Sequence, residues 1–132
     1  MILLHTRETL LQPGQARRIW LLAGWMGLAA IFVLSTVPTV ETFDDLIGWN
    51  DKIRHALAYG VMMGWFAHAY PQKSWPYLAA LLFTYSGALE VVQHTLPARQ
   101  GSIDDLAANA VGIIVVYLAY RPMITDSDPS TE

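Results

Sequence analysis

Apolar residues dominate four long stretches of the chain, and polar residues gather between them. A membrane-spanning helix needs about 20 mostly apolar residues. The pattern predicts such helices over residues 19–37, about 53–70, about 75–92 and about 106–120, with the last beginning nearer Ile103. Pro38 ends the first stretch, because proline disfavours helix in the residue before it. The predicted fold class is all-α, a polytopic membrane protein built as a four-transmembrane-helix bundle.

The same pattern predicts three regions. Residues 1–18 form a cytoplasmic N-terminal segment, 19–120 the four-helix transmembrane domain, and 121–132 a polar, disordered cytoplasmic tail. The first apolar stretch carries no charge, is longer than the apolar part of a usual signal peptide, and is not followed by an A-x-A-like cleavage site. We therefore interpret it as a retained span.

Composition supports a membrane environment and excludes several kinds of site. Hydrophobic residues make up 54% of the chain and charged residues 14%, against roughly 45–50% and about 25% in soluble domains. A net charge of -3 gives no electrostatic footprint for nucleic acid. The chain has no cysteine, which excludes disulfides, thiolate metal sites and a cysteine nucleophile.

The distribution of Lys and Arg predicts the orientation. Arg17 and Arg18 abut the first span, which usually dominates topology, and cytoplasmic segments carry an excess of such residues. With both termini in the cytoplasm, five basic residues lie inside and three outside; these are Arg7, Arg17, Arg18, Lys73 and Arg121 against Lys52, Arg54 and Arg99. We expect a multi-pass protein of the bacterial cytoplasmic (inner) membrane, with loops 38–52 and 93–102 facing outward.

This topology brings polar residues from three helices to one membrane depth. His55 lies at the outer start of the second span, Glu90 at the outer end of the third, and Asp105 at the outer start of the fourth. Residues three or four apart share a helix face, which adds three further polar side chains to the same site: Tyr59, Gln93 and Asn109. Asp104 is interpreted as the helix cap of the fourth span.

Each of these residues has a structural as well as a functional interpretation. A carboxylate at the centre of a membrane helix costs about 2.5–3.5 kcal/mol on insertion scales, and less near the interface. Glu90 therefore needs a partner, for which Arg99 is well placed, and either an ion pair or a catalytic carboxylate would explain it. Gly60 and Gly64 form a G-x-x-x-G pattern, which permits close helix contact; we expect packing within the monomer rather than dimerisation.

The motifs "DKIRHALAY" and "ALEVVQHTLPARQGSIDDLAANAVG" resemble the VanZ-like family of bacterial integral membrane proteins. The resemblance covers about residues 19–120, although the first span is matched only by its hydrophobicity. The founding member is linked to resistance to the glycopeptide teicoplanin, so the resemblance implies a link of this kind but no defined reaction. The matching residues are Asp51, Lys52, His55, Tyr59, Glu90, Gln93, Pro97, Arg99, Ser102, Asp105, Asn109 and Gly112.

Two classes of function remain open. The first is a membrane enzyme or binding protein for an anionic lipid or cell-wall precursor, in which Glu90 or Asp105 is the general base and His55 an acid or base. Substrate would be bound by Asp51, Lys52, Arg54, Tyr59, Gln93, Arg99 and Asn109.

The second is a non-catalytic membrane scaffold or partner subunit whose polar cluster is structural. A pocket between the second, third and fourth spans would favour the first class, and a sealed ion-pair network the second. No cofactor is predicted. His55, Glu90 and Asp105 have suitable ligand types for a metal, but their spacing requires none.

Overall fold

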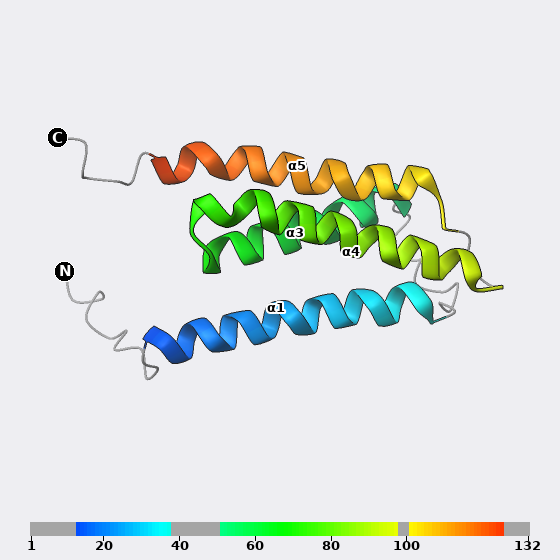
Figure 1. Ribbon diagram of the computed structural model, residues 1–132, viewed down its shortest axis with the longest axis horizontal. Helices are drawn as coiled ribbons and strands as arrows, with labels where there is room; N and C mark the ends of the chain where they lie inside the picture. Colours follow the sequence, from blue (N-terminus) through cyan, green and yellow to red (C-terminus); the bar gives the residue numbers. More distant parts are fainter. Residues whose placement is uncertain (1–12, 38–50, 98–100, 126–132) are drawn as a thin grey trace, which may run out of the picture.

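The computed structural model describes residues 13–37, 51–97 and 101–125 (Figure 1). Within these ranges the chain is helical and contains no strand, which confirms the all-α class. The helices are α1 (Pro13–Thr36), α3 (Asp51–Ala69), the short 3-10 helix η1 (Gln72–Ser74), α4 (Trp75–Thr95) and α5 (Ile103–Thr125).

The four long helices match the four predicted spans, but each extends beyond its apolar stretch. Helix α1 begins at Pro13, a residue suited to the first helical turn. Helix α5 begins at Ile103 as expected and ends at Thr125, five residues later than predicted. A backbone hydrogen-bond ladder continues through polar residues, so hydropathy marks the apolar part of a helix rather than its ends. Residues 126–132 of the predicted tail lie outside the described residues.

Two of the helices are long and apolar enough to cross a membrane. These are the segments Gly14–Thr36, with a mean hydropathy of 1.9, and Ile103–Arg121, with 1.5. Only 11% and 17% of these segments are buried inside the protein, unlike the core helix of a soluble protein. Helices α3 and α4 do not meet the same criteria by themselves.

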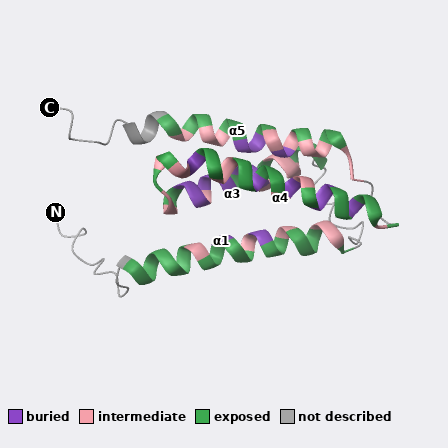
Figure 2. Ribbon diagram, in the orientation of Figure 1, coloured by how far each residue is buried: buried purple, intermediate pink, exposed green. Residues whose placement is uncertain are grey.

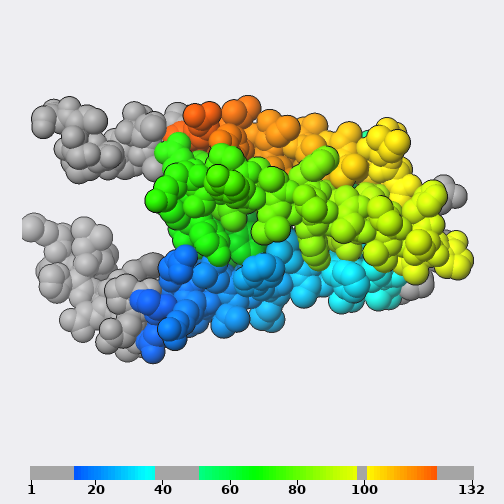
Figure 3. All heavy atoms as spheres, in the orientation of Figure 1, coloured from blue at the N-terminus to red at the C-terminus, as the bar shows by residue number. Residues whose placement is uncertain are grey.

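Long helices that follow one another in the chain alternate in direction. Trp20 near the start of α1 contacts Trp65 near the end of α3: the rings stack with centroids 3.9 Å apart, and each indole nitrogen donates to the other residue's carbonyl oxygen, at 2.8 and 2.9 Å. Farther along α1, the Leu28 carbonyl oxygen accepts a 2.7 Å hydrogen bond from the Tyr85 hydroxyl of α4. Figure 3 shows α1 lying along α4 for much of its length.

Helix α3 is central and supplies much of the core. Tyr59, Met62, Met63 and Phe66 are buried and pack in one cluster with side chains of the other three long helices. The outward surfaces are nevertheless apolar; Figure 2 shows how much of α1 is exposed. Exposed large apolar residues occur on every long helix, among them Leu22, Met26, Leu57, Val61, Leu81, Phe83, Val111 and Val115.

Glycines allow α3 and α5 to pack side by side in parallel. A Cβ on Gly112 of α5 would collide with the backbone carbonyl of Ala56 in α3. A Cβ on Gly60 would lie 3.2 Å from the Gly112 carbonyl oxygen, and one on Gly64 would lie 3.4 Å from the Val116 side chain. Both glycines of the G-x-x-x-G pattern therefore serve packing within the chain, as expected. The close approach also fixes how far α3 is shifted along α5.

Candidate functional site

Three helix ends meet at one end of the bundle, on the right of Figure 1: the start of α3, the end of α4 and the start of α5. We call this the polar end, because it carries Asp51, His55, Glu90, Asp105 and Asn109. The alternating helix directions bring these residues together, as the sequence predicted. Arg99 and residues 38–50 lie outside the described residues.

A buried hydrogen bond joins α3 to α5 at this end. His55 Nδ1 and Asn109 Oδ1 are 3.0 Å apart, and Asn109 is only 1% exposed. Since Asn109 Oδ1 can only accept, His55 Nδ1 carries the proton and donates it. His55 Nε2 lies 3.8 Å from Asp51 Oδ2. The Asn109 amide nitrogen is buried and has no hydrogen-bond partner among the described residues.

Exposed ion pairs surround this hydrogen bond. Lys52 Nζ donates to Asp104 Oδ2 at 3.0 Å and so links α3 to α5. This hydrogen bond is the main reason that the pKa of Lys52 is raised above its ordinary value. Within α3, the Arg54 guanidinium pairs with Asp51. Exposed pairs of this kind contribute little to stability. Little stability is therefore lost if Lys52 or Arg54 turns to contact a ligand.

Glu90 shapes the entrance to α5. Its side chain accepts a 3.0 Å hydrogen bond from the Ser102 backbone N–H, and the residue is 9% exposed. Gly101 packs so tightly that a Cβ there would meet the Glu90 carbonyl oxygen. The observed partner of Glu90 is therefore a backbone amide. The carboxylate holds the segment that leads into α5.

The cap of α5 is Ser102 and not Asp104, which corrects the prediction. Ser102 Oγ accepts a 3.1 Å hydrogen bond from the Asp105 backbone N–H, as an N-cap serine does. Asp104 and Asp105 lie in the first turn, where acidic side chains complement the helix dipole. The Ser-x-x-Asp spacing resembles a capping box and could have identified Ser102 from the sequence.

Two further predicted site residues lie deeper in the protein. Gln93 is 6% exposed, and its Nε2 donates a 3.0 Å hydrogen bond to the Ser35 carbonyl oxygen of α1. Tyr59 is 2% exposed and belongs to the core cluster. The contacts seen for both are internal, and neither forms part of the exposed surface of the polar end.

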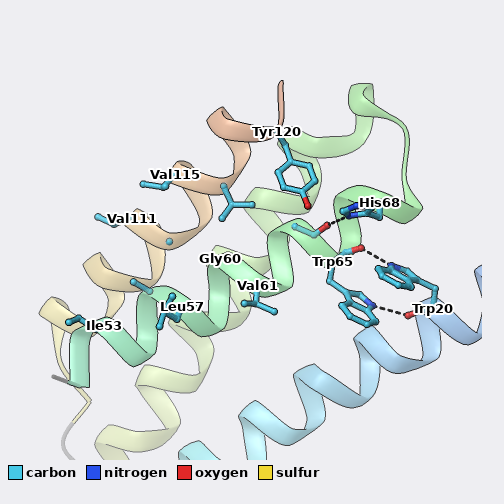
Figure 4. Close-up of a pocket in the computed structure, with 14 residues that line it drawn as sticks. Trp20, Ile53, Leu57, Gly60, Val61, Trp65, His68, Val111, Val115 and Tyr120 are labelled. Carbon is cyan, nitrogen blue, oxygen red and sulfur yellow. Dashed lines mark hydrogen bonds between the residues drawn. The ribbon is translucent and has the colours of Figure 1, made fainter. Parts of the chain in front are cut away.

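An apolar groove of about 580 Å³ runs along α3 and α5 (Figure 4). Gly60 and Gly112 line it, and aliphatic side chains form its sides. It extends from Ile53 beside the polar end to Trp20 and Tyr120 at the opposite end. A pocket between the second, third and fourth spans would have favoured an enzyme or binding protein, but none of this groove's lining residues belongs to α4.

The polar end also holds a group of potential metal ligands. One ligand atom each from Asp51, His55 and Asp105 lie within 4.8 Å of one another. The sequence predicted no metal site, although His55, Glu90 and Asp105 had suitable ligand types. The structure groups Asp51 in place of Glu90, because Asp51 and His55 are four residues apart on the same face of α3.

Comparison with known proteins confirms the family resemblance. No curated protein and no solved structure matches the chain. A family model described as VanZ/LLP1 matches residues 5–125, which extends the resemblance beyond residues 19–120. With the two apolar helices, this match indicates a membrane protein. The chain therefore belongs to the VanZ/LLP1 family.

Proposed function

We propose that the chain crosses the membrane four times and binds an anionic lipid or lipid-linked cell-wall precursor at its polar end. The observation that carries this proposal is the concentration of polar side chains from three helices at one end of a bundle whose outer surfaces are apolar. Polar groups at membrane depth usually face a partner or a ligand pathway.

The packing supports four spans. Helices α1 and α5 are apolar enough to cross by themselves, and α3 contacts both of them. A helix packed between two spanning helices lies at the same membrane depth. Leu57 and Val61 of α3 and Leu81 of α4 are at least 45% exposed. Large exposed apolar surfaces of this kind suit lipid better than water.

We place the polar end on the outer face of the cytoplasmic membrane and both termini in the cytoplasm. Arg17 and Arg18 lie near the start of α1, at the opposite end from Asp51 and Asp105. Juxtamembrane arginines favour the cytoplasmic side. Arg17 donates to the Ala69 carbonyl oxygen at 3.2 Å, so it also marks the end of α3 that faces inward in this orientation.

The ligand would lie with its charged headgroup at the polar end and an apolar chain in the groove. Lys52 and Arg54 are partly exposed and supply the cations that an anionic headgroup requires. The groove begins at the adjacent Ile53 and continues for 15 residues of α3 to His68, about 22 Å at 1.5 Å per residue. One leaflet makes up half of a hydrocarbon core that is about 30 Å thick. The groove is therefore longer than the apolar part of one leaflet.

If the chain is an enzyme, His55 and Asp105 are better catalytic candidates than Glu90. Glu90 already accepts the Ser102 N–H and is largely buried. His55 is held by Asn109 and keeps one ring nitrogen directed toward Asp51. A histidine oriented in this way can act as a base.

The proposal is tested by identifying lipids that co-purify with the full chain, using native mass spectrometry in a mild detergent. We expect one anionic lipid class to be retained, and to be lost in the variant Lys52→Gln/Arg54→Gln. Lys73→Gln is the matched control, because Lys73 is exposed at the opposite end. Absence of bound lipid in the wild type, or equal retention in the double variant, would refute the proposal.

A structural scaffold is the second candidate, and one observation favours it. Most charged and polar groups of the polar end already have a partner within the chain, as in Lys52–Asp104 and His55–Asn109. Lys52→Gln/Arg54→Gln separates the two functions, since exposed ion pairs contribute little to stability. A folded double variant that no longer complements a deletion strain supports a binding site. Full complementation by this variant supports the scaffold.

A further inference from the structure

The polar end is richer in acidic than in basic groups, although the proposed ligand is anionic. Among the described residues, four carboxylates face two basic side chains there: Asp51, Asp104, Asp105 and Glu90 against Lys52 and Arg54. The Asp105 carboxylate is half-buried and makes no salt bridge or side-chain hydrogen bond with any described residue. Such a group favours a nearby positive charge.

The second ring nitrogen of His55, Nε2, is directed at another of these carboxylates, that of Asp51. Asn109 Oδ1 accepts the proton of His55 Nδ1 at 3.0 Å, which leaves a lone pair on His55 Nε2. That lone pair faces Asp51 Oδ2 at 3.8 Å, a separation too long for a hydrogen bond. Two acceptors this close attract a bridging donor or a positive charge, and a divalent metal ion can take both of them as ligands.

The surroundings of His55 are those of a metal ligand. Metal-binding histidines almost always donate their other ring N–H to a fixed oxygen. Asn109 provides that oxygen and is held almost completely buried. Its amide nitrogen is also buried without a partner among the described residues, so it can donate to a further oxygen at the same place.

We propose that Asp51, His55 and Asp105 bind one divalent transition-metal ion, Zn²⁺ or Mn²⁺, through one oxygen of each aspartate and His55 Nε2. Their ligand atoms already lie within 4.8 Å of one another. Bond lengths of 2.0–2.2 Å place two ligands of a tetrahedral zinc about 3.4 Å apart. The 3.8 Å between His55 Nε2 and Asp51 Oδ2 therefore needs a small closure, and separations of up to 4.8 Å within the group need a larger one, through side-chain rotation.

Three protein ligands leave one coordination position open, as in catalytic zinc sites. Two carboxylates and a neutral imidazole balance the charge of a divalent ion. An anionic headgroup oxygen can then occupy the open position without facing uncompensated carboxylates. This last step rests on the proposed function, whereas the metal site itself does not.

The test is calorimetric titration of the full chain, purified in detergent and stripped with EDTA, with Zn²⁺ alone and separately with Mn²⁺ alone. We expect one equivalent to bind the wild type. His55→Gln and Asp105→Asn should weaken binding at least tenfold, and Asn109→Ala by about 10–100-fold, because it only positions His55. Asp104→Asn is the matched control: Asp104 neighbours Asp105, but it pairs with Lys52, so affinity should be unchanged.

Absence of saturable binding, or equal affinity in His55→Gln and the wild type, would overturn the proposal. Circular dichroism shows whether each variant keeps its helices. If Asp105→Asn does not fold, the exposed position of Asp51 makes Asp51→Asn the substitute. Lipid retention by the stripped protein is measured separately. Retained lipid without metal binding refutes the metal site alone, and metal binding without lipid refutes the proposed function alone.

Discussion

The contact between α3 and α5 predicts a large effect of a very small substitution, Gly112→Ala. The added methyl group would collide with the carbonyl of Ala56 and lie 2.7 Å from its carbonyl carbon. These are backbone atoms, so no side-chain rotation relieves the collision and the helices must separate. Overpacking of this kind costs about 1–3 kcal/mol, and an immovable backbone favours the upper value.

A glycine-to-alanine change also has a favourable part, because alanine is the better helix former by about 1 kcal/mol. Gly112→Ala should therefore destabilise the protein by about 2 kcal/mol in net terms. Gly87→Ala isolates the favourable part, since the nearest atom to its added Cβ is Leu106 Cδ1 at 3.9 Å. That variant should gain about 1 kcal/mol. The two substitutions thus differ by about 3 kcal/mol although they are chemically identical.

The assay is reversible denaturant unfolding in detergent micelles, followed by tryptophan fluorescence and checked by circular dichroism. Equal stability of the Gly112→Ala and Gly87→Ala proteins would refute the close packing of α3 on α5. It would also undermine the placement of His55 beside Asn109, which depends on the same helix separation.

Two further predictions concern opposite ends of the bundle. Trp20→Phe removes a hydrogen bond to the Trp65 carbonyl oxygen and part of a stacked pair. The free energy of unfolding should therefore fall by about 1–2 kcal/mol in the same denaturant assay. Trp25→Phe is the control, because Trp25 is 54% exposed, and it should change this free energy less. Lys52→Gln breaks an exposed ion pair with Asp104 and should leave the unfolding midpoint within experimental error, and a clear loss would show that this pair is structural.

The sequence was sufficient to predict which residues share one end of the bundle. Apolar stretches of spanning length, joined by short connections, alternate in direction, and this places His55, Glu90 and Asp105 together. Residues four apart on a helix then add Asn109 to the same group. These inferences need only helix periodicity and chain order, both of which can be read from one sequence.

The partner of each residue could not be predicted in the same way. Arg99, the expected partner of Glu90, lies outside the described residues, and the hydrogen bond seen for Glu90 is to the Ser102 backbone N–H. Backbone donors carry no sequence signal, so a side chain that binds one looks unpaired in the sequence. The pairing of His55 with Asn109 depends on the shift between α3 and α5, which Gly112 sets.

The location of the groove was also not predictable. It runs along two parallel helices that pack closely at glycines, and it lies away from α4. A hydrophobic pattern shows which stretches are apolar, but not which apolar surfaces remain uncovered after packing.

Helix α1 is held by its backbone at three points, which has a consequence for how the chain can evolve. The carbonyl oxygens of Trp20, Leu28 and Ser35 accept hydrogen bonds from side chains of α3 and α4. A carbonyl acceptor is present whatever side chain the residue carries. Most positions of α1 can therefore exchange one apolar residue for another without losing these attachments, apart from those where a small residue is needed, as at Gly24 against Phe66.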